Sequence, residues 1–269
     1  MQSVKRAYCE YLNTDGGAEI YRAFQRIVYA RNDSLVARLN NHFLRYLTLP
    51  RRETLRACDI GGGDGHRIAR IIEFLHREFG KRFHLDFIEQ SKHYIDMFDA
   101  AAIGRSCETT KIHNLFENVT LPRSSYDLVF LIHSIFAFSG RAALSKVLSL
   151  RNKAGKIIII SNAPGSFLGG LKKLVDEEFS DERYEVDGVE RDLQRRLVLY
   201  DCYEFQTTWS IEPEGRQLDT ILEWISLGRF KGFDSDKKRA IYSYIDENGV
   251  IEKGMQRFVE RERILIVQN

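Results

Sequence analysis

Hydrophobic residues in the first fifty positions recur at the three- and four-residue spacing of helices. One series runs from Ile20 to Val28, and a second runs from Leu35 to Leu47. The polar residues 32–34 provide N-cap chemistry before the second series, and Pro50 predicts its end. We therefore expect a helical segment at residues 1–50, ahead of a main domain at residues 51–269.

The pattern changes at Leu55, where short apolar runs begin to alternate with amphipathic stretches. The runs predict five strands, at 55–60, 83–88, 109–113, 127–132 and 156–161. Helices are predicted between them, at 66–79, 91–102 and 141–150. Strands that alternate with helices in this way form parallel sheets with right-handed crossovers.

The last third of the chain is less regular. Its pattern predicts four helices, at 165–179, 189–197, 218–230 and 237–245. Two further strands are predicted at 200–209 and 263–268. The expected fold is therefore α/β and Rossmann-like, with a mostly parallel sheet of seven strands and helical insertions in the C-terminal third.

The charged residues indicate no nucleic-acid partner. Lysine and arginine number 40 against 38 acidic residues, which leaves a net charge of +2. The basic pairs, such as Arg51 and Arg52, are scattered among acids and indicate a solvated surface. The longest apolar runs have the length of a strand, and no apolar run near the N-terminus suits a signal peptide. We expect a cytoplasmic protein without a membrane partner.

The cysteines lie far apart in the sequence, at Cys9, Cys58, Cys107 and Cys202. This spacing provides neither a CxxC pair nor a Cys/His cluster for zinc. We expect reduced, mostly buried thiols and no bound metal. The oligomeric state stays open.

The strongest chemical signal is the glycine-rich segment that follows the first predicted strand. Glycines let the backbone adopt positive φ angles and let a ligand approach without an intervening Cβ. The spacing GxGxG, in place of the GxGxxG of dinucleotide-binding loops, favours S-adenosylmethionine (SAM) over NAD. The alternative is a simple turn between a strand and a helix. We expect the cofactor to contact Asp59, Gly61, Gly62, Gly63 and Gly65.

Glu89 ends the second predicted strand, 24 residues after Gly65. This offset is close to the roughly 20 residues that separate a glycine loop from the acid that binds ribose hydroxyls. The alternative is a helix N-cap or a solvated strand end. The same acid disfavours NADP, whose 2′-phosphate it would repel.

His133 follows the fourth predicted strand. Ligands of open α/β sheets bind at the carboxyl ends of the strands, so this histidine is placed where a methyl donor and a methyl acceptor meet. It is the candidate catalytic residue, either as a general base or as a group that orients the acceptor. The alternative is a polar cap for the helix that follows.

With these three signals the chain resembles the class I SAM-dependent methyltransferases, and among them the histamine N-methyltransferase family. The similarity extends over nearly the whole length and is specific in DIGGGDGHRIARII, IEQSKHYI and DLVFLIHSIFAF. It continues weakly through GSFLGGLKKLVDEEF, YDCYEFQTTWSIEP and RERILIVQN. The resemblance implies that SAM is the cofactor and that residues 1–50 form a lid. We also expect Gln90, Asn114 and Ile132 to line the cofactor site with His133.

The resemblance implies a changed substrate pocket. The family has a glutamine at the position of His133 and two tyrosines at the positions of Phe136 and Ala137. Glu19 is the nearest match to the acid that binds the substrate amine, and Glu260 falls near an asparagine that contacts substrate. We expect Glu19, Phe136 and Glu260 to bind the acceptor.

The expected function is therefore transfer of a methyl group from SAM to a nitrogen or oxygen of a small molecule, in specialised metabolism. One alternative is a SAM-binding protein that transfers no methyl group and instead regulates or assists cyclisation. Another is a methyltransferase for protein or RNA. Release of S-adenosylhomocysteine with a given acceptor distinguishes these possibilities.

Overall fold

The computed structural model describes residues 10–11, 13–99, 103–104, 106–135, 140–175, 185–212 and 215–268, with only the backbone of residue 30. The chain divides into two compact units, each built from three segments. The first unit comprises Met1–Asn32, Asn162–Arg183 and Glu204–Glu262. The second unit comprises Asp33–Ser161, Tyr184–Tyr203 and Arg263–Asn269.

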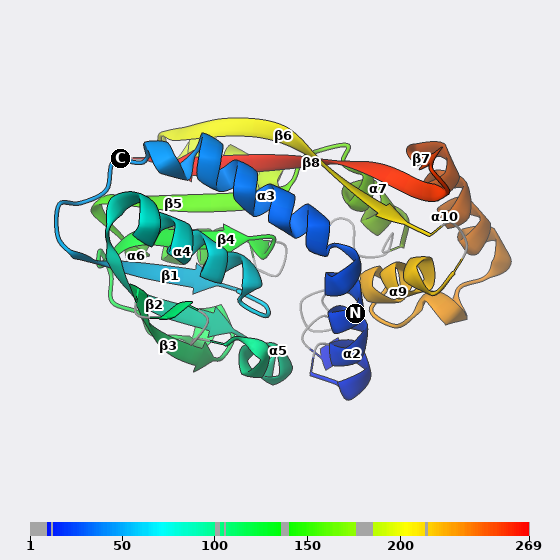
Figure 1. Cartoon of the computed structure of the whole chain (residues 1–269), viewed down its shortest axis with the longest axis horizontal. Helices are drawn as coiled ribbons and strands as arrows, with labels where there is room; N and C mark the ends of the chain where they lie inside the picture. Colours follow the sequence, from blue (N-terminus) through cyan, green and yellow to red (C-terminus); the bar gives the residue numbers. More distant parts are fainter. Residues whose placement is uncertain are drawn as a thin grey trace. The chain divides into compact units, whose positions relative to one another are not determined.

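The second unit is a parallel α/β assembly (Figure 1). The first half of the sheet contains β1 (Thr54–Ile60), β2 (Arg82–Glu89), β3 (Cys107–His113), β4 (Tyr126–Ile132) and β5 (Arg151–Asn162). Strand β1 pairs in parallel with β2 and β4, β2 with β3, and β4 with β5. The five strands predicted from the first two thirds of the sequence are all present, and each begins earlier than predicted.

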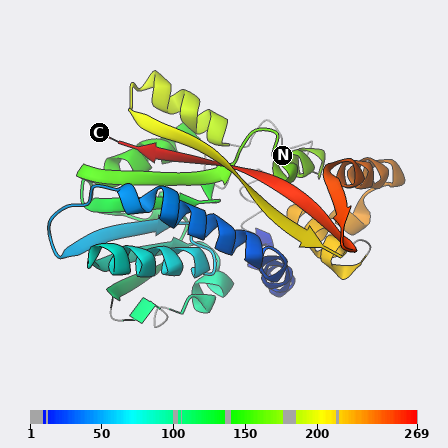
Figure 2. The ribbon, with the colours of Figure 1, turned by 45° about the horizontal axis from the view of Figure 1, so that its top comes forward.

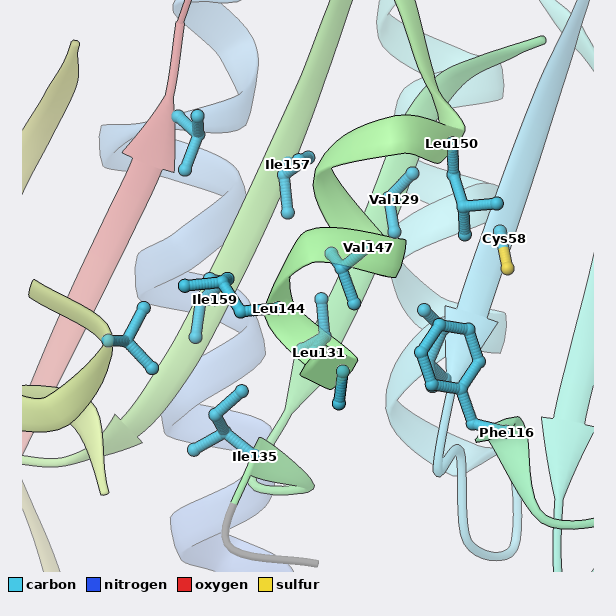
Figure 3. Close-up of a cluster of buried hydrophobic side chains, with 14 of the residues drawn as sticks. Cys58, Phe116, Val129, Leu131, Ile135, Leu144, Val147, Leu150, Ile157 and Ile159 are labelled. Atoms are coloured by element: carbon cyan, nitrogen blue, oxygen red, sulfur yellow. The ribbon is translucent and has the colours of Figure 1, made fainter. Parts of the chain in front are cut away.

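Helices cover both faces of these strands, as crossover connections require. The α-helices that lie wholly in the second unit are α4 (His66–Phe79), α5 (Lys92–Met97), α6 (Arg141–Leu150) and α8 (Val186–Arg195). Leu144 and Val147 of α6 pack with Val129, Leu131 and Ile157 in one buried cluster (Figure 3). Helix α4 lies on the opposite face (Figures 1 and 2). Every residue of β4 is buried, as expected for a central strand that is covered on both sides.

The strand order is β3-β2-β1-β4-β5-β8-β6, with β7 paired antiparallel to β8 outside this path. Strands β6 (Tyr200–Ile211) and β8 (Met255–Val267) contribute residues to both units. The described sheet therefore has eight strands rather than the predicted seven. The additional strand is β7 (Gly249–Glu252), only four residues long and largely exposed.

The N-terminal residues form α2 (Asp15–Ile27), α3 (Tyr29–His42) and the 3-10 turn η1 (Leu44–Tyr46). Two details of the prediction are wrong. Residues 32–34 lie inside α3 rather than at its N-cap, and α3 ends at His42 rather than near Pro50. The boundary between the units falls after Asn32, within α3, so the proposed extent of the lid stays a prediction.

The remaining helices of the first unit are α7 (Phe167–Val175), α9 (Arg216–Ile225) and α10 (Ser235–Asn248), with the 3-10 turn η6 (Phe230–Gly232). A buried ion pair lies within this unit, where Arg31 Nε donates to Glu262 Oε1 over 3.0 Å. Thr207 also donates to this carboxylate oxygen. The pair joins residues that are 231 positions apart.

The described cysteines are free, and their burial differs from the prediction. Cys58 is buried in the core, Cys107 is half-buried and Cys202 is exposed, while Cys9 lies outside the described residues. Burial raises the pKa of the Cys58 thiol well above its usual value. None of the helices that the structure describes has the length and hydropathy of a membrane span.

Candidate functional site

The glycine-rich segment forms a turn between β1 and α4, at the carboxyl end of β1. The amides of Gly61 and Gly62 donate to the carbonyl of Ile88 at the end of β2, over 2.9 and 3.3 Å. Gly61, Gly63 and Gly65 have positive φ angles between 61° and 76°. The chain runs from β1 to β2 on one side and later returns to β4 on the other, so this turn lies where the strand order reverses. Open α/β sheets bind their ligands at this position.

Protein atoms occupy the space where three of the glycines lack a side chain. A Cβ on Gly62 would lie 2.1 Å from the ring of Phe87, and a Cβ on Gly65 would lie 2.1 Å from the ring of Phe98. A Cβ on Gly61 would lie 2.6 Å from that of Ser134. At these positions the missing side chain therefore allows close packing of the protein, and contact of the glycines with a cofactor stays a prediction.

Glu89 is buried at the end of β2 and contacts the glycine loop directly. Its Oε2 accepts from the amide of Gly63, and its Oε1 accepts from the amide of Ser91, both over 2.8 Å. Burial raises the pKa of Glu89 to about 7, although these amide donors oppose the shift. Each carboxylate oxygen has more than one acceptor position, so the group can still bind donors of a ligand.

Asp59 and Asp127 are both buried on the central strands, but they differ in their hydrogen bonds. Asp127, near the amino end of β4, accepts from the amide of Arg56 over 2.8 Å and from Asn152 Nδ2 over 2.7 Å, and pairs with Arg52. Asp59, near the carboxyl end of β1, has an Oδ1 without a hydrogen-bond partner among the described residues. Burial, followed by the charge of Glu89, raises the pKa of Asp59 to about 7.

His133 directly follows β4 and has an unusual backbone conformation. Its φ is +55°, and its amide donates to the carbonyl of Ile160 on β5 over 2.8 Å. Few residues other than glycine adopt this conformation, and such strain is concentrated at functional sites. The side chain is half-buried, and Ile132 before it is buried. Phe136 and Ala137 lie outside the described residues.

The other predicted cofactor residues lie at the same edge of the sheet. Gln90 follows β2, and its carbonyl lies 3.1 Å from Nε2 of His113. Asn114 follows β3, its amide donates to the carbonyl of Glu89 over 3.1 Å, and its side chain is exposed. The structure thus brings the predicted cofactor residues together at the carboxyl ends of β1, β2, β3 and β4.

Two predicted substrate residues belong to the first unit. Glu19 is exposed on α2. Glu260 on β8 is fully buried, where it accepts from Asn162 Nδ2 over 2.9 Å and from the amide of Leu168 over 3.0 Å. Burial raises the pKa of Glu260. Both of its oxygens therefore hold parts of the protein, while the contacts of Glu19 and Glu260 with an acceptor stay predictions.

The sequence interpretation missed the residues that pack beneath the glycine loop. The rings of Phe87 and Phe98 lie 4.3 Å apart. Lys111 on β3 holds this arrangement, because its ammonium donates to the carbonyls of Ile95 and Phe98 and lies over the Phe98 ring. Phe87 has the alternation of an ordinary buried strand residue, and Phe98 follows α5, so neither position has a sequence signal that indicates the loop.

Comparison with solved structures identifies the fold. The chain is similar to a SAM-dependent methyltransferase of Leishmania major (16% identity, TM-score 0.54, 97% of this chain and 81% of that one). It is also similar to the plantazolicin methyltransferase BpumL, crystallised with a substrate analogue and S-adenosylhomocysteine (14%, 0.55, 99% and 95%). A third match is the YcgJ protein of Bacillus subtilis (14%, 0.57, 90% and 99%).

The fold is therefore the Rossmann-like fold of the class I SAM-dependent methyltransferases. The sequence itself matches no protein-family model and no curated protein. Nothing in these comparisons singles out the histamine N-methyltransferase family.

Proposed function

We propose that this protein binds SAM at the glycine loop and transfers its methyl group to a nitrogen or oxygen of a small molecule. One observation carries the proposal. The turn at Gly61–Gly65 lies at the switch point of a methyltransferase-type sheet, and its amide at Gly63 is bonded to the buried carboxylate of Glu89. A glycine loop fixed to an acid at the end of the next strand is the arrangement that a ribose-containing ligand requires.

The residues at the site fit such a ligand. Asp59 has a buried oxygen without a hydrogen-bond partner among the described residues, and a buried acceptor of this kind calls for a donor. In the proposal, Glu89 accepts the ribose hydroxyls, and Asp59, Gln90 and Asn114 line the site. SAM, when bound, supplies a methyl group on a positively charged sulfur.

The chain itself has to orient the acceptor, exclude water and accept a proton. Positioning of two reactants can contribute about 7–11 kcal/mol in favourable intramolecular examples. An amine has to be neutral to use its lone pair, and an oxygen acceptor has to lose its proton. The imidazole of His133 lies at this edge and can donate or accept a hydrogen bond or take up a proton, so we assign it either this proton or the orientation of the acceptor.

The acceptor is proposed to be small and to be covered by the N-terminal helices as a lid, with Glu19 as a polar contact. This part of the proposal comes from the sequence resemblance to histamine N-methyltransferases. The replacements at His133 and Phe136 argue for an acceptor other than histamine. BpumL, with the same fold, was crystallised with an analogue of desmethylplantazolicin, so the fold by itself does not define the class of acceptor.

The first experiment is calorimetry with SAM, S-adenosylhomocysteine and NAD. We expect binding of the first two and none of NAD, and the opposite result would end the proposal. A screen of small amines, phenols, peptides and RNA, read by release of S-adenosylhomocysteine, then defines the acceptor. Binding without turnover across the whole screen would favour a SAM-binding protein that transfers no methyl group.

The role of His133 is tested with His133→Gln. If the histidine removes a proton, the variant should lose about 10²- to 10⁴-fold in rate together with the acidic limb of the pH profile. If the histidine orients the acceptor, glutamine should serve nearly as well, because an amide also donates and accepts hydrogen bonds. A normal rate with an unchanged pH profile would exclude the base. We favour orientation, since an amine acceptor that is already neutral needs no base in the transition state.

A further inference from the structure

An ionic contact within the second unit connects α3 to the first turn of α4. Asp33 on α3 lies 3.2 Å from Nε2 of His66, measured from its Oδ1, and the same oxygen pairs with Arg70. His66 and Arg70 are four residues apart on α4 and so lie on one face of it. The three side chains are between 30% and 39% exposed, so water still reaches the contact.

The first turn of α4 directly follows the glycine loop. Its N-cap is Gly65, which has no side chain to accept from the first amides. The carboxylate of Asp64 accepts from the amide of His66 over 3.1 Å. This turn also carries Arg67, whose charge opposes the rise in the pKa of the buried Asp59. A shift of the turn would therefore displace both the glycine loop and a charge that acts on the site.

We propose that Asp33 is a positioning residue of the cofactor site. Asp33 holds the first turn of α4 in place through its contacts with His66 and Arg70. This turn then keeps the loop at residues 61–65 in the conformation that accepts the cofactor. The inference rests on the proposed function for its ligand, SAM. It adds a residue of the N-terminal segment to the residues that determine cofactor affinity, although Asp33 itself touches none of the proposed binding groups.

The Asp33 contact changes the fraction of molecules in which the loop is competent to bind, rather than the global stability of the fold. Ion pairs that are this exposed add little to the stability of a fold. If the loop is competent to bind in only a fraction of the molecules, however, the apparent dissociation constant equals the intrinsic one divided by that fraction. If loss of Asp33 lowers the competent fraction to between a third and a tenth, the dissociation constant for SAM rises about three- to tenfold.

The chain offers a matched control at the opposite end of the same helix. Glu78, in the last turn of α4, lies 3.5 Å from Arg45 of η1, measured from its Oε1 to Nε. This pair also joins the N-terminal segment to α4, and its side chains are exposed to a similar degree. This pair is at the opposite end of α4 from the glycine loop. Removal of Glu78 should therefore affect stability as removal of Asp33 does, without an effect on cofactor affinity.

The experiment compares Asp33→Ala and Glu78→Ala in the full chain by calorimetry with SAM and by thermal unfolding. We expect similar small changes in Tm, a three- to tenfold weaker affinity for Asp33→Ala, and an unchanged affinity for Glu78→Ala. Asp33→Asn keeps an acceptor for Arg70 and should recover part of the affinity. Equal SAM affinities in Asp33→Ala and wild type, or equal losses in the two alanine variants, would overturn the inference.

Amide hydrogen exchange separates this inference from the proposed function. In the unliganded chain, exchange at residues 62–68 should accelerate in Asp33→Ala and stay at the wild-type rate in Glu78→Ala. If wild type failed to bind SAM, the proposed function would fail while this measurement still decided the positioning role. Unchanged exchange in Asp33→Ala would refute the positioning role whatever the ligand is.

Discussion

Buried aspartates at the two ends of the parallel strands differ in how completely they are hydrogen-bonded. At the amino end, Asp127 has a full set of donors from Arg52, Arg56 and Asn152. At the carboxyl end, Asp59 keeps an oxygen without a partner among the described residues, and its pKa is raised to about 7. An acid whose bonds are complete stabilises the fold, whereas an incompletely bonded acid indicates a place for a ligand.

Helix α4 shows the same contrast at its two glycine ends. Gly65 and Gly80 both have left-handed φ angles, of 76° and 64°. A Cβ on Gly80 would meet nothing within 4 Å, whereas a Cβ on Gly65 would lie 2.1 Å from the Phe98 ring. A side chain at Gly80 therefore has room that a side chain at Gly65 lacks, and this difference can be measured.

The largest effect is expected from Gly65→Ala compared with Gly80→Ala. Both changes place a side chain at positive φ, at a cost of about 1–2 kcal/mol. Only Gly65→Ala also forces apart the loop and the Phe98 ring, so we expect a loss of SAM affinity greater than about 100-fold, equivalent to about 2.7 kcal/mol. Calorimetry and thermal unfolding measure both quantities.

In this comparison Gly80→Ala is the control, with lower stability and normal SAM affinity. Loss of affinity in both variants would mean that strain anywhere in α4 disturbs the site. Normal affinity in Gly65→Ala would show that the Phe98 contact does not shape the loop.

The next effect, on stability rather than on SAM affinity, is expected when each aspartate is changed to asparagine. Asp127→Asn places an amide donor against existing donors, and we expect the free energy of unfolding to fall by about 2–4 kcal/mol. Asp59→Asn removes a charge that is buried with incomplete compensation, so stability at pH 8 should stay equal or rise by on the order of 1–3 kcal/mol. Denaturant unfolding of both variants at constant pH gives the two values.

The sign of the Asp59 effect has its own test in the pH dependence. Because the folded pKa of about 7 lies above the ordinary value of 3.8, the stability from this group is present at low pH and is lost as the pH rises from about 4 to 7. Asp59→Asn should make that slope shallower, and the slope that remains comes from Glu89, whose pKa is also raised to about 7. A slope as steep in the variant as in wild type would contradict the assignment to Asp59.

The smallest predicted effect is a pH dependence of SAM affinity through Glu89. The raised pKa of about 7 belongs to the unliganded protein, and hydroxyl donors of a bound ligand favour the charged carboxylate. Binding should therefore release a proton, and affinity should rise with pH up to about 7 and then level off. Below pH 7 the slope approaches about tenfold per pH unit for one group. Glu89→Gln should bind more weakly and without this slope, and a flat wild-type profile from pH 5.5 to 8 would contradict the assignment.

Among the first five strands, β1, β2, β4 and β5 were predictable because apolar residues recur along each, whereas β3 has the mostly polar sequence CETTKIH. Strand β8 was predicted only from residue 263, although it begins at Met255. Its buried face carries Gln256, Glu260 and Glu262, so the usual rule that polar residues point outward gave the wrong answer. Arg31 compensates Glu262, and nothing local in the sequence reveals a partner 231 residues away.

In the candidate site too, features set by local spacing were predictable and features set by side-chain packing were not. The glycine spacing and the position of Glu89 could be recognised in the sequence because they depend on the offset between neighbouring elements. The contacts of Gly62 with Phe87 and of Gly65 with Phe98 depend on side-chain packing, which periodicity does not report. The Asp33 contact joins two helices that are separated by a strand and was equally invisible.

The division of the chain has a consequence for biosynthesis. The second unit draws on Asp33–Ser161 and also on Arg263–Asn269, which the ribosome makes more than a hundred residues later. The parallel strands can form early, yet the sheet order places β8 directly beside β5. Until β8 is made, β5 has an unpaired edge, and such edges favour association with other chains. A nascent chain of this protein is therefore vulnerable along β5 while the residues between Asn162 and Met255 are made.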